Sequence, residues 1–231
     1  MSIRPDARLL RCAEYVTRGG YVLDVGTDHA YLPCYLVENG VSVGAAASDI
    51  SDGPLLSAKK TVGRKGLESA VMLIKSDGLK DIPEEVLSKA TDIVVAGMGG
   101  ELIAKIVCEG GPLLGKNYIL QPNTRAAALR RALFENGFVI EAESAVRDGK
   151  FLYTVICGKF SGKKRSPSEL ECEIGRLDPT DIDSAELLKN EAERLFCAAR
   201  GLETSPNEKR LAEAQRLRAL ADKIKDFAEK G

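Results

Sequence analysis

The chain lacks several features that would place it in a common class of proteins. Its 231 residues include no tryptophan and one histidine, and its formal net charge of −1 gives no overall basic character for binding a polyanion. No apolar run approaches the roughly 18 residues that a membrane span requires. The N-terminal stretch MSIRPDARLLRCAEYV also lacks the apolar core of a secretory signal. We therefore expect a cytoplasmic protein with no membrane partner, in which any nucleic-acid contact is a local basic face.

The cysteines and the single histidine provide no metal-binding pattern. There is no CxxC pair, and no set of histidines is present to complete a zinc site. Because free cysteine usually packs as a small apolar side chain, we expect reduced thiols and no metal. The six cysteines are Cys12, Cys34, Cys108, Cys157, Cys172 and Cys197.

Short apolar runs alternate with longer helix-like segments from residue 21 to about residue 160. This alternation predicts the α/β class, with a parallel sheet covered by helices on both faces. Ligands of open α/β sheets bind at the carboxyl ends of the strands, so the site is expected in the turns that follow them. The predicted strands are residues 21–25, 43–48, 71–75, 92–96 and 118–121, and helices are expected to begin near His29, Gly53, Pro83, Gly100 and Thr124.

Two further β-rich stretches lie within residues 138–160 and are joined by the turn sequence RDGK at residues 147–150. They predict an antiparallel hairpin that closes the sheet. Five parallel strands followed by a terminal hairpin are more typical of methyltransferases that use S-adenosylmethionine (SAM) than of dinucleotide dehydrogenases. The GxGxxG fingerprint of those dehydrogenases is also missing, which disfavours an NAD-dependent oxidoreductase.

The composition changes after residue 160, where the polar and basic segment SGKKRSPSE is typical of a linker. We therefore predict two units, residues 1–160 and residues 161–231. In the second unit, apolar residues recur at steps of three and four on both sides of a break at residues 205–207, which predicts two antiparallel helices packed along one seam. These helices either close the domain structurally or form an arm that binds a partner or RNA. The seam residues are Leu188, Ala192, Leu195, Ala199 and Leu202, then Leu217, Leu220, Ile224 and Phe227.

The turns after the first four predicted strands carry candidate contacts for an adenosine-containing cofactor. Asp24 and Gly26 share the first turn, where a glycine lets the backbone approach a ligand closely and carboxylates suit the cationic sulfonium and amino group of SAM. Asp49, 25 residues later, can accept hydrogen bonds from both ribose hydroxyls, and Asp77 can accept one from the adenine amino group. The predicted cofactor-binding residues are Asp24, Gly26, Asp49, Ile50, Ser76, Asp77, Gly78 and Gly97.

Four stretches of the chain, taken in order, resemble one bacterial family. LDVGTDHAYLP, SDISDGPLLSA, IVVAGMGGELI and YILQPNTRAAALRRALFENGF are similar to motifs of the tRNA (adenine-N1)-methyltransferase family TrmK, which modifies adenine 22. The similarity runs from about residue 5 to the end. It implies a class I, Rossmann-like methyltransferase domain with a C-terminal helical coiled-coil extension, SAM as methyl donor and tRNA as substrate. A methyltransferase acting on another RNA or a small molecule, or a noncatalytic SAM- or RNA-binding module, is the alternative.

The candidate catalytic residues follow from the chemistry that the resemblance implies. Adenine N1 has an available lone pair and attacks a methyl group without prior loss of a proton, so the site needs no strong general base. Asp28 is expected to face the sulfonium or the adenine amino group and to stabilise positive charge. His29 and Tyr31 are candidates for stacking on the target base, although a histidine satisfied by the helix start is the structural alternative. The amides of Gln121 and Asn123 can read a base taken out of its stack, or Asn123 can simply cap the next helix.

Basic side chains supply candidate contacts for the tRNA phosphates. Arg125, Arg130 and Arg131 follow the fifth strand, but arginines spaced in this way usually form a solvated helix face. The linker is therefore the stronger candidate for contacts with RNA. Separately, we expect the chain to act as a monomer. The linker cluster consists of Lys159, Lys163, Lys164 and Arg165.

Overall fold

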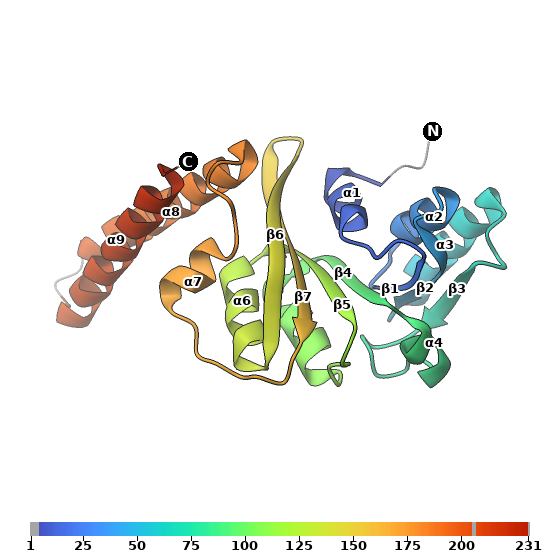
Figure 1. Cartoon of the computed structure of the whole chain (residues 1–231). Coiled ribbons are helices and arrows are strands. Elements are labelled where there is room, and N and C mark those ends of the chain that lie inside the picture. The colour runs from blue at the N-terminus through green and yellow to red at the C-terminus, as the bar shows by residue number, and fades with distance from the viewer. Residues whose placement is uncertain (1–4, 205–206, 231) are drawn as a thin grey trace.

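The computed structural model describes residues 5–204 and 207–230, and Figure 1 shows how they are arranged. A seven-stranded sheet forms the centre, with strand order β3-β2-β1-β4-β5-β7-β6. The first five strands are parallel, while β7 runs antiparallel to both β5 and β6. The strands are β1 (Gly20–Val25), β2 (Ser42–Asp49), β3 (Val71–Lys75), β4 (Asp92–Gly99), β5 (Asn117–Thr124), β6 (Phe138–Asp148) and β7 (Phe151–Phe160).

Helices cover both faces of the sheet, because successive side chains of a buried strand point to opposite faces. Leu23 packs toward the face covered by α4, α5 and α6, whereas its neighbour Val22 packs toward α1 and α2. A smaller cluster fixes α3 against β2 and β3 through Ala58 and Val62. The helices are α1 (Ala7–Glu14), α2 (Tyr31–Glu38), α3 (Asp52–Lys65), α4 (Glu84–Lys89), α5 (Gly100–Ala104), the π-helical turn η1 (Lys105–Glu109) and α6 (Ala126–Glu135).

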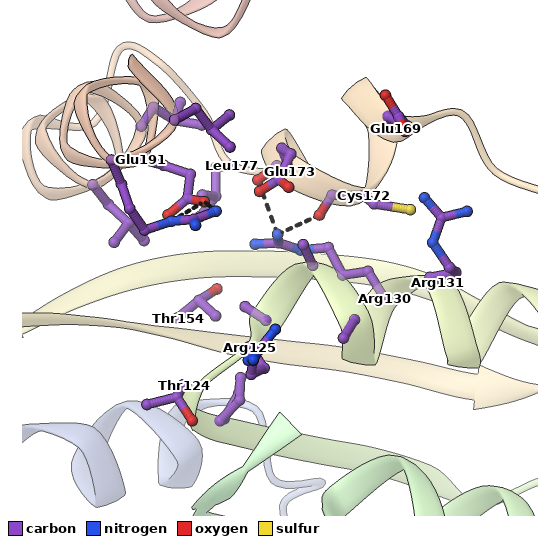
Figure 2. Close-up of a pocket in the computed structure, with 18 of the residues that line it drawn as sticks. Thr124, Arg125, Arg130, Arg131, Thr154, Glu169, Cys172, Glu173, Leu177 and Glu191 are labelled. Atoms are coloured by element: carbon purple, nitrogen blue, oxygen red, sulfur yellow. Dashed lines mark hydrogen bonds and ion pairs between the residues drawn. The ribbon is translucent and has the colours of Figure 1, made fainter. Parts of the chain in front are cut away.

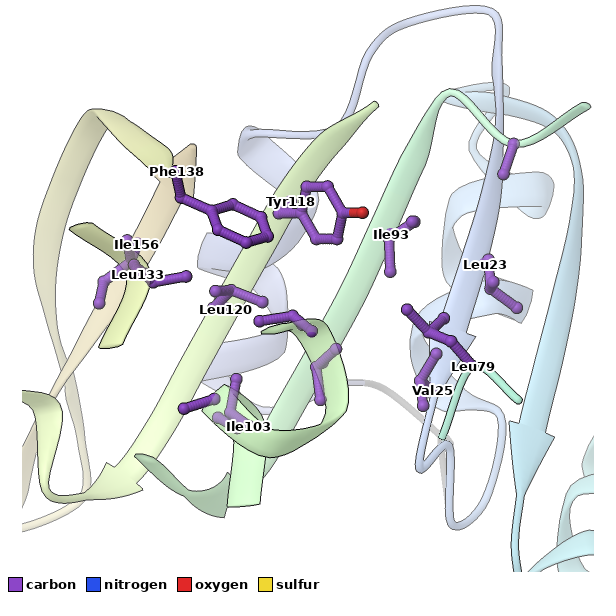
Figure 3. Packing of buried hydrophobic residues seen from close by; sticks show 14 of the residues in the cluster. Leu23, Val25, Leu79, Ile93, Ile103, Tyr118, Leu120, Leu133, Phe138 and Ile156 are labelled. Carbon is purple, nitrogen blue, oxygen red and sulfur yellow. The ribbon is translucent and has the colours of Figure 1, made fainter. Parts of the chain in front are cut away.

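The larger core cluster is centred on the inner strands, as Figure 3 shows. Ile93 and Leu120 are fully buried there, and the ring of Tyr118 meets the ring of Phe138 edge to face at 5.1 Å. The Tyr118 hydroxyl accepts a hydrogen bond of 2.7 Å from the backbone N–H of Leu113, so this buried polar atom is satisfied. The core thus fixes β4 and β5 firmly beneath the turns that follow them.

The described residues beyond residue 160 form three helices: α7 (Glu169–Ile174), α8 (Ile182–Glu203) and α9 (Glu208–Ala228). The predicted seam between α8 and α9 is confirmed, since Leu188, Leu195 and Ile224 are buried in one apolar cluster. That cluster includes Ala145 of β6, so the helical pair also packs against the last strand of the sheet. Of the predicted break, Ser205 and Pro206 lie outside the described residues, and Asn207 accepts a hydrogen bond from the backbone of Lys209 as the N-cap of α9.

The predicted strands and helix starts agree with the structure to within a few residues. The strand expected at residues 71–75 is found with those bounds, and the hairpin turns at Gly149 and Lys150 between β6 and β7. The expectation that His29 begins a helix is wrong by two residues, because α2 begins at Tyr31 after a left-handed turn. Within the described residues no helix combines the length and the apolar character that crossing a membrane would require.

Arg130 is not on a solvated helix face, contrary to the structural expectation from its spacing. Its guanidinium is buried and forms an ion pair of 2.6 Å with Glu143 of β6. It also donates to the backbone carbonyls of Cys172 and Glu173 in α7, at 2.6 and 2.9 Å. Glu143 in turn accepts from the backbone N–H of Arg176 at 3.0 Å. This buried network fastens the C-terminal helices to the sheet.

We expect Arg130→Ala to lower the free energy of unfolding by about 3–5 kcal/mol, because the change leaves the Glu143 carboxylate buried without its cation. Chemical denaturation at neutral pH measures the effect. Arg131→Ala is the matched control, since Arg131 is the next residue on α6, is half-buried, and forms only a loose ion pair of 4.0 Å with the exposed Glu135 among the described residues. The control is expected to change stability by less than about 0.5 kcal/mol. Equal losses in the two variants would show that the buried ion pair is not the anchor.

Candidate functional site

The carboxyl end of β1 contains a buried carboxylate. Asp24 is 5% exposed and accepts a hydrogen bond of 2.6 Å from the hydroxyl of Thr27. Burial raises its pKa to about 6; the Thr27 hydrogen bond opposes that shift, and the charge of Asp49 adds to it. Burial makes ionisation of this carboxyl group unfavourable. A cationic group of a bound ligand would offset part of that free-energy cost, so the carboxylate is well suited to bind such a group.

Gly26 and Gly97 bring two strand ends close together. Both have positive φ, 76° and 81°, a conformation that favours glycine. A Cβ on Gly26 would lie 1.9 Å from the Met98 side chain, whereas a Cβ on Gly97 would meet no atom within 4 Å. Gly97 therefore borders open space at the end of β4, while Gly26 is required for packing between the first and fourth strand ends.

The turns after β2 and β3 continue this edge of the sheet. Asp49 accepts a hydrogen bond of 2.9 Å from the backbone of Ser51, and Ile50 beside it is exposed. Ser76 is buried and closes its own turn by donating to the carbonyl of Gly78 at 2.9 Å. Four of the predicted cofactor residues, Asp49, Ile50, Ser76 and Gly78, thus lie at the ends of two neighbouring strands.

Asp77 is exposed in the turn after β3 and forms an ion pair of 2.6 Å with Lys80. The Lys80 ammonium lowers the pKa of the Asp77 carboxyl, so Asp77 is an anion at neutral pH. An anionic carboxylate is able to accept a hydrogen bond from an exocyclic amine.

The segment after Thr27 is strained. Asp28 and Ala30 have φ values of 52° and 55°, a left-handed conformation that costs non-glycine residues about 1–2 kcal/mol each. His29 lies between them, and its ring stacks on that of Tyr31 with centroids 5.0 Å apart and planes 11° from parallel. The Asp28 carboxylate is 3.4 Å from His29 Nε2 and is largely exposed. Backbone strain at two of three consecutive residues in a predicted catalytic motif supports a functional role for this turn.

The amides of β5 are held by Arg8, a residue that no sequence motif singles out. Gln121 is fully buried, and its Oε1 accepts from the backbone N–H of Gly97 at 3.0 Å. Asn123 donates from Nδ2 to the carbonyl of the same glycine at 2.7 Å. Arg8 of α1 donates to both amide oxygens, at 3.3 and 2.8 Å. Arg8 is more than 110 residues from this pair along the chain, so no local motif connects them.

The strand order divides the candidate residues into two groups. Asp24, Asp49 and Asp77 lie at the ends of the consecutive strands β1, β2 and β3. Asp28 follows β1, and Asn123 belongs to β5 on the other side of β4. The direction of winding reverses between β1 and β4, and ligands of open α/β sheets bind in the crevice at that point. The buried Asp24 offers a carboxylate for a cationic group of SAM, and Gly97 borders open space beside it, so the residues at this crevice fit that cofactor.

A groove of about 740 Å³ extends this edge toward the C-terminal helices (Figure 2). It begins at residues 122–125 at the end of β5 and is bounded by α6, β7 and the three C-terminal helices. Its charges are mixed. Arg125, the N-cap residue of α6, and Arg131 line it together with Glu173 and Glu191. Burial, followed by the charge of Glu191, raises the pKa of Glu173. The groove joins the candidate site to the helical pair without being a uniformly basic channel.

The predicted basic linker lies at the opposite edge of the sheet. Lys159 of β7 lies opposite Asn117 at the start of β5 in the antiparallel register. Asn123 is six residues further along β5, about 20 Å away. Lys159 forms an ion pair of 2.9 Å with Glu141. Arg165 lies over the ring of Phe134, 3.8 Å from its centroid, and pairs with Glu171 at 3.0 Å. Lys163 and Lys164 are exposed and their ammonium groups form no contact with the described residues.

None of the buried cysteines has the environment of a nucleophile. Burial raises the pKa of Cys12, and it raises the pKa of Cys34, Cys108 and Cys157 to about 11, so these groups stay as neutral thiols at pH 7. All six cysteines are free.

Comparisons with known proteins agree with this geometry. Residues 22–226 match the family TrmK, described as tRNA (adenine(22)-N(1))-methyltransferase. The chain is 38% identical over 177 residues to the tRNA (adenine(22)-N(1))-methyltransferase of Bacillus subtilis, covering 76% of this chain and 73% of that protein. The crystal structure of the B. subtilis m1A22 tRNA methyltransferase TrmK superposes with a TM-score of 0.86 at 28% identity, covering 97% of this chain and all of that one.

A second solved structure concerns the cofactor. Streptococcus pneumoniae Sp1610 in complex with S-adenosyl-L-methionine superposes with a TM-score of 0.80 at 32% identity, and the match covers 94% of this chain and 98% of that chain. The likeness extends over the C-terminal helices as well as the sheet, because nearly the whole length of both chains is covered.

The raised pKa of Asp24 predicts a pH-dependent instability of the ligand-free protein. A carboxyl that binds its proton more tightly when folded contributes stability below its usual pKa of 3.8, and that stability is lost as the pH rises through about 6. Asp24→Asn should therefore be more stable than the parent protein at pH 7.5, by roughly 2–3 kcal/mol, since one pKa unit corresponds to about 1.4 kcal/mol. Denaturation curves from pH 4 to pH 8 measure this difference. A gain that is the same at every pH would contradict the assignment to Asp24 ionisation.

Proposed function

The chain belongs to the TrmK family of tRNA (adenine(22)-N(1))-methyltransferases, and we propose that the carboxyl edge of its parallel strands is the catalytic site. Its function is transfer of a methyl group from SAM to N1 of adenine 22 in tRNA. The observation that supports this site best is the junction of β1 and β4, where a buried carboxylate, an open glycine turn and the left-handed Asp28 lie at adjoining strand ends. We also propose the division into a catalytic unit, residues 1–160, and a helical unit, residues 161–231. Residues 1–4, 205–206 and 231 of those ranges lie outside the described part of the chain.

SAM supplies a methyl group activated by a cationic sulfonium. On the cofactor side, we assign Asp24 to the amino group of SAM, because that cation would lower the cost of ionising the buried carboxylate. We assign Asp49 to the ribose hydroxyls, although one of its carboxylate oxygens already accepts a hydrogen bond from the backbone N–H of Ser51. We assign Asp77 to the adenine amino group. The turns at Gly26 and Gly78, both with positive φ, shape the backbone around the ligand.

On the substrate side, the chain has to hold adenine N1 in line with the methyl group and to stabilise the positive charge that the base gains. We assign the second task to Asp28. Its carboxylate is exposed at the switch point, and its one ion-pair partner among the described residues is His29, the single histidine of the chain. The stacked rings of His29 and Tyr31 form a short aromatic platform next to that carboxylate, as an extruded base requires.

Asp28→Asn is expected to lower the rate of 1-methyladenosine formation by at least about 100-fold, because the change removes the negative charge that stabilises the cationic product. Asparagine tolerates the left-handed conformation of this position, so folding should be retained. Asp28→Ala should abolish turnover as well, with little loss of folding. The measurement is nucleoside mass spectrometry of unmodified tRNA incubated with SAM carrying a labelled methyl group.

Glu68→Ala provides the matched control, because Glu68 is an exposed carboxylate at the amino edge of β3, away from the strand ends of the site. It should leave the rate unchanged. Full activity of Asp28→Asn would remove Asp28 from the mechanism. SAM binding by the parent protein without methyl transfer to any tRNA would instead favour a noncatalytic binding module.

We propose that Lys163 and Lys164 of the linker bind tRNA phosphates remote from the target base. Their ammonium groups are exposed and unpaired within the described residues, whereas Lys159 and Arg165 are already paired with carboxylates. Because the linker lies at the other edge of the sheet, such contacts would add affinity without aligning the reacting atoms.

Substitution of both lysines, Lys163→Ala with Lys164→Ala, should raise the KM for tRNA while leaving kcat within about twofold, and it should reduce the salt dependence of tRNA binding by about one unit of slope per lysine. Steady-state kinetics and binding at several salt concentrations test this. Lys59→Ala with Lys60→Ala, on exposed α3, is the control pair. An unchanged KM and salt slope would exclude the linker from the RNA interface.

A further inference from the structure

Arg8 connects three separate parts of the chain at the substrate side of the site. Its Nη2 is 2.5 Å from Asp6 at the start of α1, and its Nε is 3.7 Å from Asp148 at the tip of the β6–β7 hairpin. Its guanidinium lies over the ring of Tyr153, 5.0 Å from the centroid. Asp6 and Asp148 thus contact Nη2 and Nε of the guanidinium. The third nitrogen, Nη1, donates to the side-chain oxygens of Gln121 and Asn123 in β5.

These contacts fix which way each amide points. The amide oxygen of Asn123 faces Arg8 at 2.8 Å and also accepts from Gln121 Nε2 at 3.3 Å. Its nitrogen must therefore point the other way, where one N–H donates to the carbonyl of Gly97. The second N–H has no partner among the described residues, and Asn123 is exposed. Asn123 consequently faces the substrate side as a hydrogen-bond donor.

The same arrangement holds the end of β4. Gln121 accepts a hydrogen bond from the backbone N–H of Gly97, and Asn123 donates one to the carbonyl of Gly97. The two side-chain amides therefore bind both backbone polar groups of this glycine. Gly97 itself has a φ of 81° and borders open space. The orientation of the Gly97 backbone thus depends on the amides, and the orientation of the amides depends on Arg8.

We propose that Arg8 is a positioning residue for methyl transfer, which orients Asn123 as a donor toward the substrate and thereby fixes the Gly97 turn. This proposal rests on the function proposed above. A guanidinium is suited to the task because its planar nitrogens contact Asp6, Asp148 and the amides at the same time, which a single ammonium cannot do.

A double-mutant cycle tests whether Arg8 acts through Asn123. Single-turnover rates at saturating SAM and tRNA are measured for the parent protein, Arg8→Ala, Asn123→Ala and the double variant. We expect Arg8→Ala to reduce the rate by about tenfold or more, as loss of a charge-assisted hydrogen bond would. The double variant should be no slower than Asn123→Ala alone, because the effect of Arg8 requires the amide. Rate losses that multiply would overturn the proposal.

Two further variants separate positioning from general stability. Arg8→Lys keeps the positive charge and should unfold close to the parent temperature, yet it should be nearly as slow as Arg8→Ala. Parent-like rates in Arg8→Lys would overturn the proposal, since charge alone would then suffice. If Arg8→Ala does not fold, or if Asn123→Ala is inactive, the methyl-transfer rate of Arg8→Lys alone tests the proposal. Arg11→Ala is the control, because Arg11 lies one turn further along α1 and pairs only with exposed Glu14.

Calorimetric titration of SAM completes the experiment. The dissociation constant of the Arg8 variants should stay within about threefold of the parent value, because Arg8 contacts none of the carboxylates assigned to the cofactor. A SAM affinity that falls as steeply as the rate would assign Arg8 to cofactor binding and overturn the proposal. A parent protein that forms no 1-methyladenosine would instead contradict the proposed function, so the two failures are distinguishable.

Discussion

The parallel alignment of five strands is the constraint on which the site depends. Parallel neighbours all leave the sheet at the same edge, so residues separated by long stretches of sequence meet there without any loop having to reach across the fold. Asp24, Asp49 and Gly97 belong to three different strands and are still neighbours at this edge. The apolar alternation that packs Leu23 and Val22 against opposite helical layers is what keeps the strands in register. The site is therefore a consequence of core packing.

The edge also stores energy that a ligand can release. Asp24 is buried with a raised pKa, and two non-glycine residues in three positions adopt left-handed backbone conformations. Neither feature stabilises the ligand-free fold. The Thr27 hydroxyl holds the Asp24 carboxylate in place. Asp24 and Asp28 thereby present negative charge where a cationic cofactor and a cationic product are expected.

Sequence patterns predicted the sheet well because the signals that define it are local. The strand at residues 71–75 needed only its apolar run and the turns beside it, and α7 could have been found from the capping box that Ser168 and Glu171 form. The predicted site residues do fall at the strand ends, although their assigned roles stay predictions. Arg8 and Arg130 could not be identified in this way. Each is a charged residue on an amphipathic helix, and only tertiary contacts with distant residues show that one holds the amides and the other is buried.

The position of the helical pair has a consequence for how a large substrate is held. Arg130 and Glu143 fasten α7 to the sheet, so α8 and α9 are fixed relative to the end of β5. The groove between them begins beside Asn123 and Arg125, whereas the unpaired lysines of the linker lie at the opposite edge. A small substrate could not contact both. An RNA large enough to span the sheet could place one nucleotide at the strand ends while its backbone reaches the linker. In the arrangement proposed above, contacts with remote phosphates would set the affinity for RNA, and Arg8 and the amides would set the alignment of the reacting atoms.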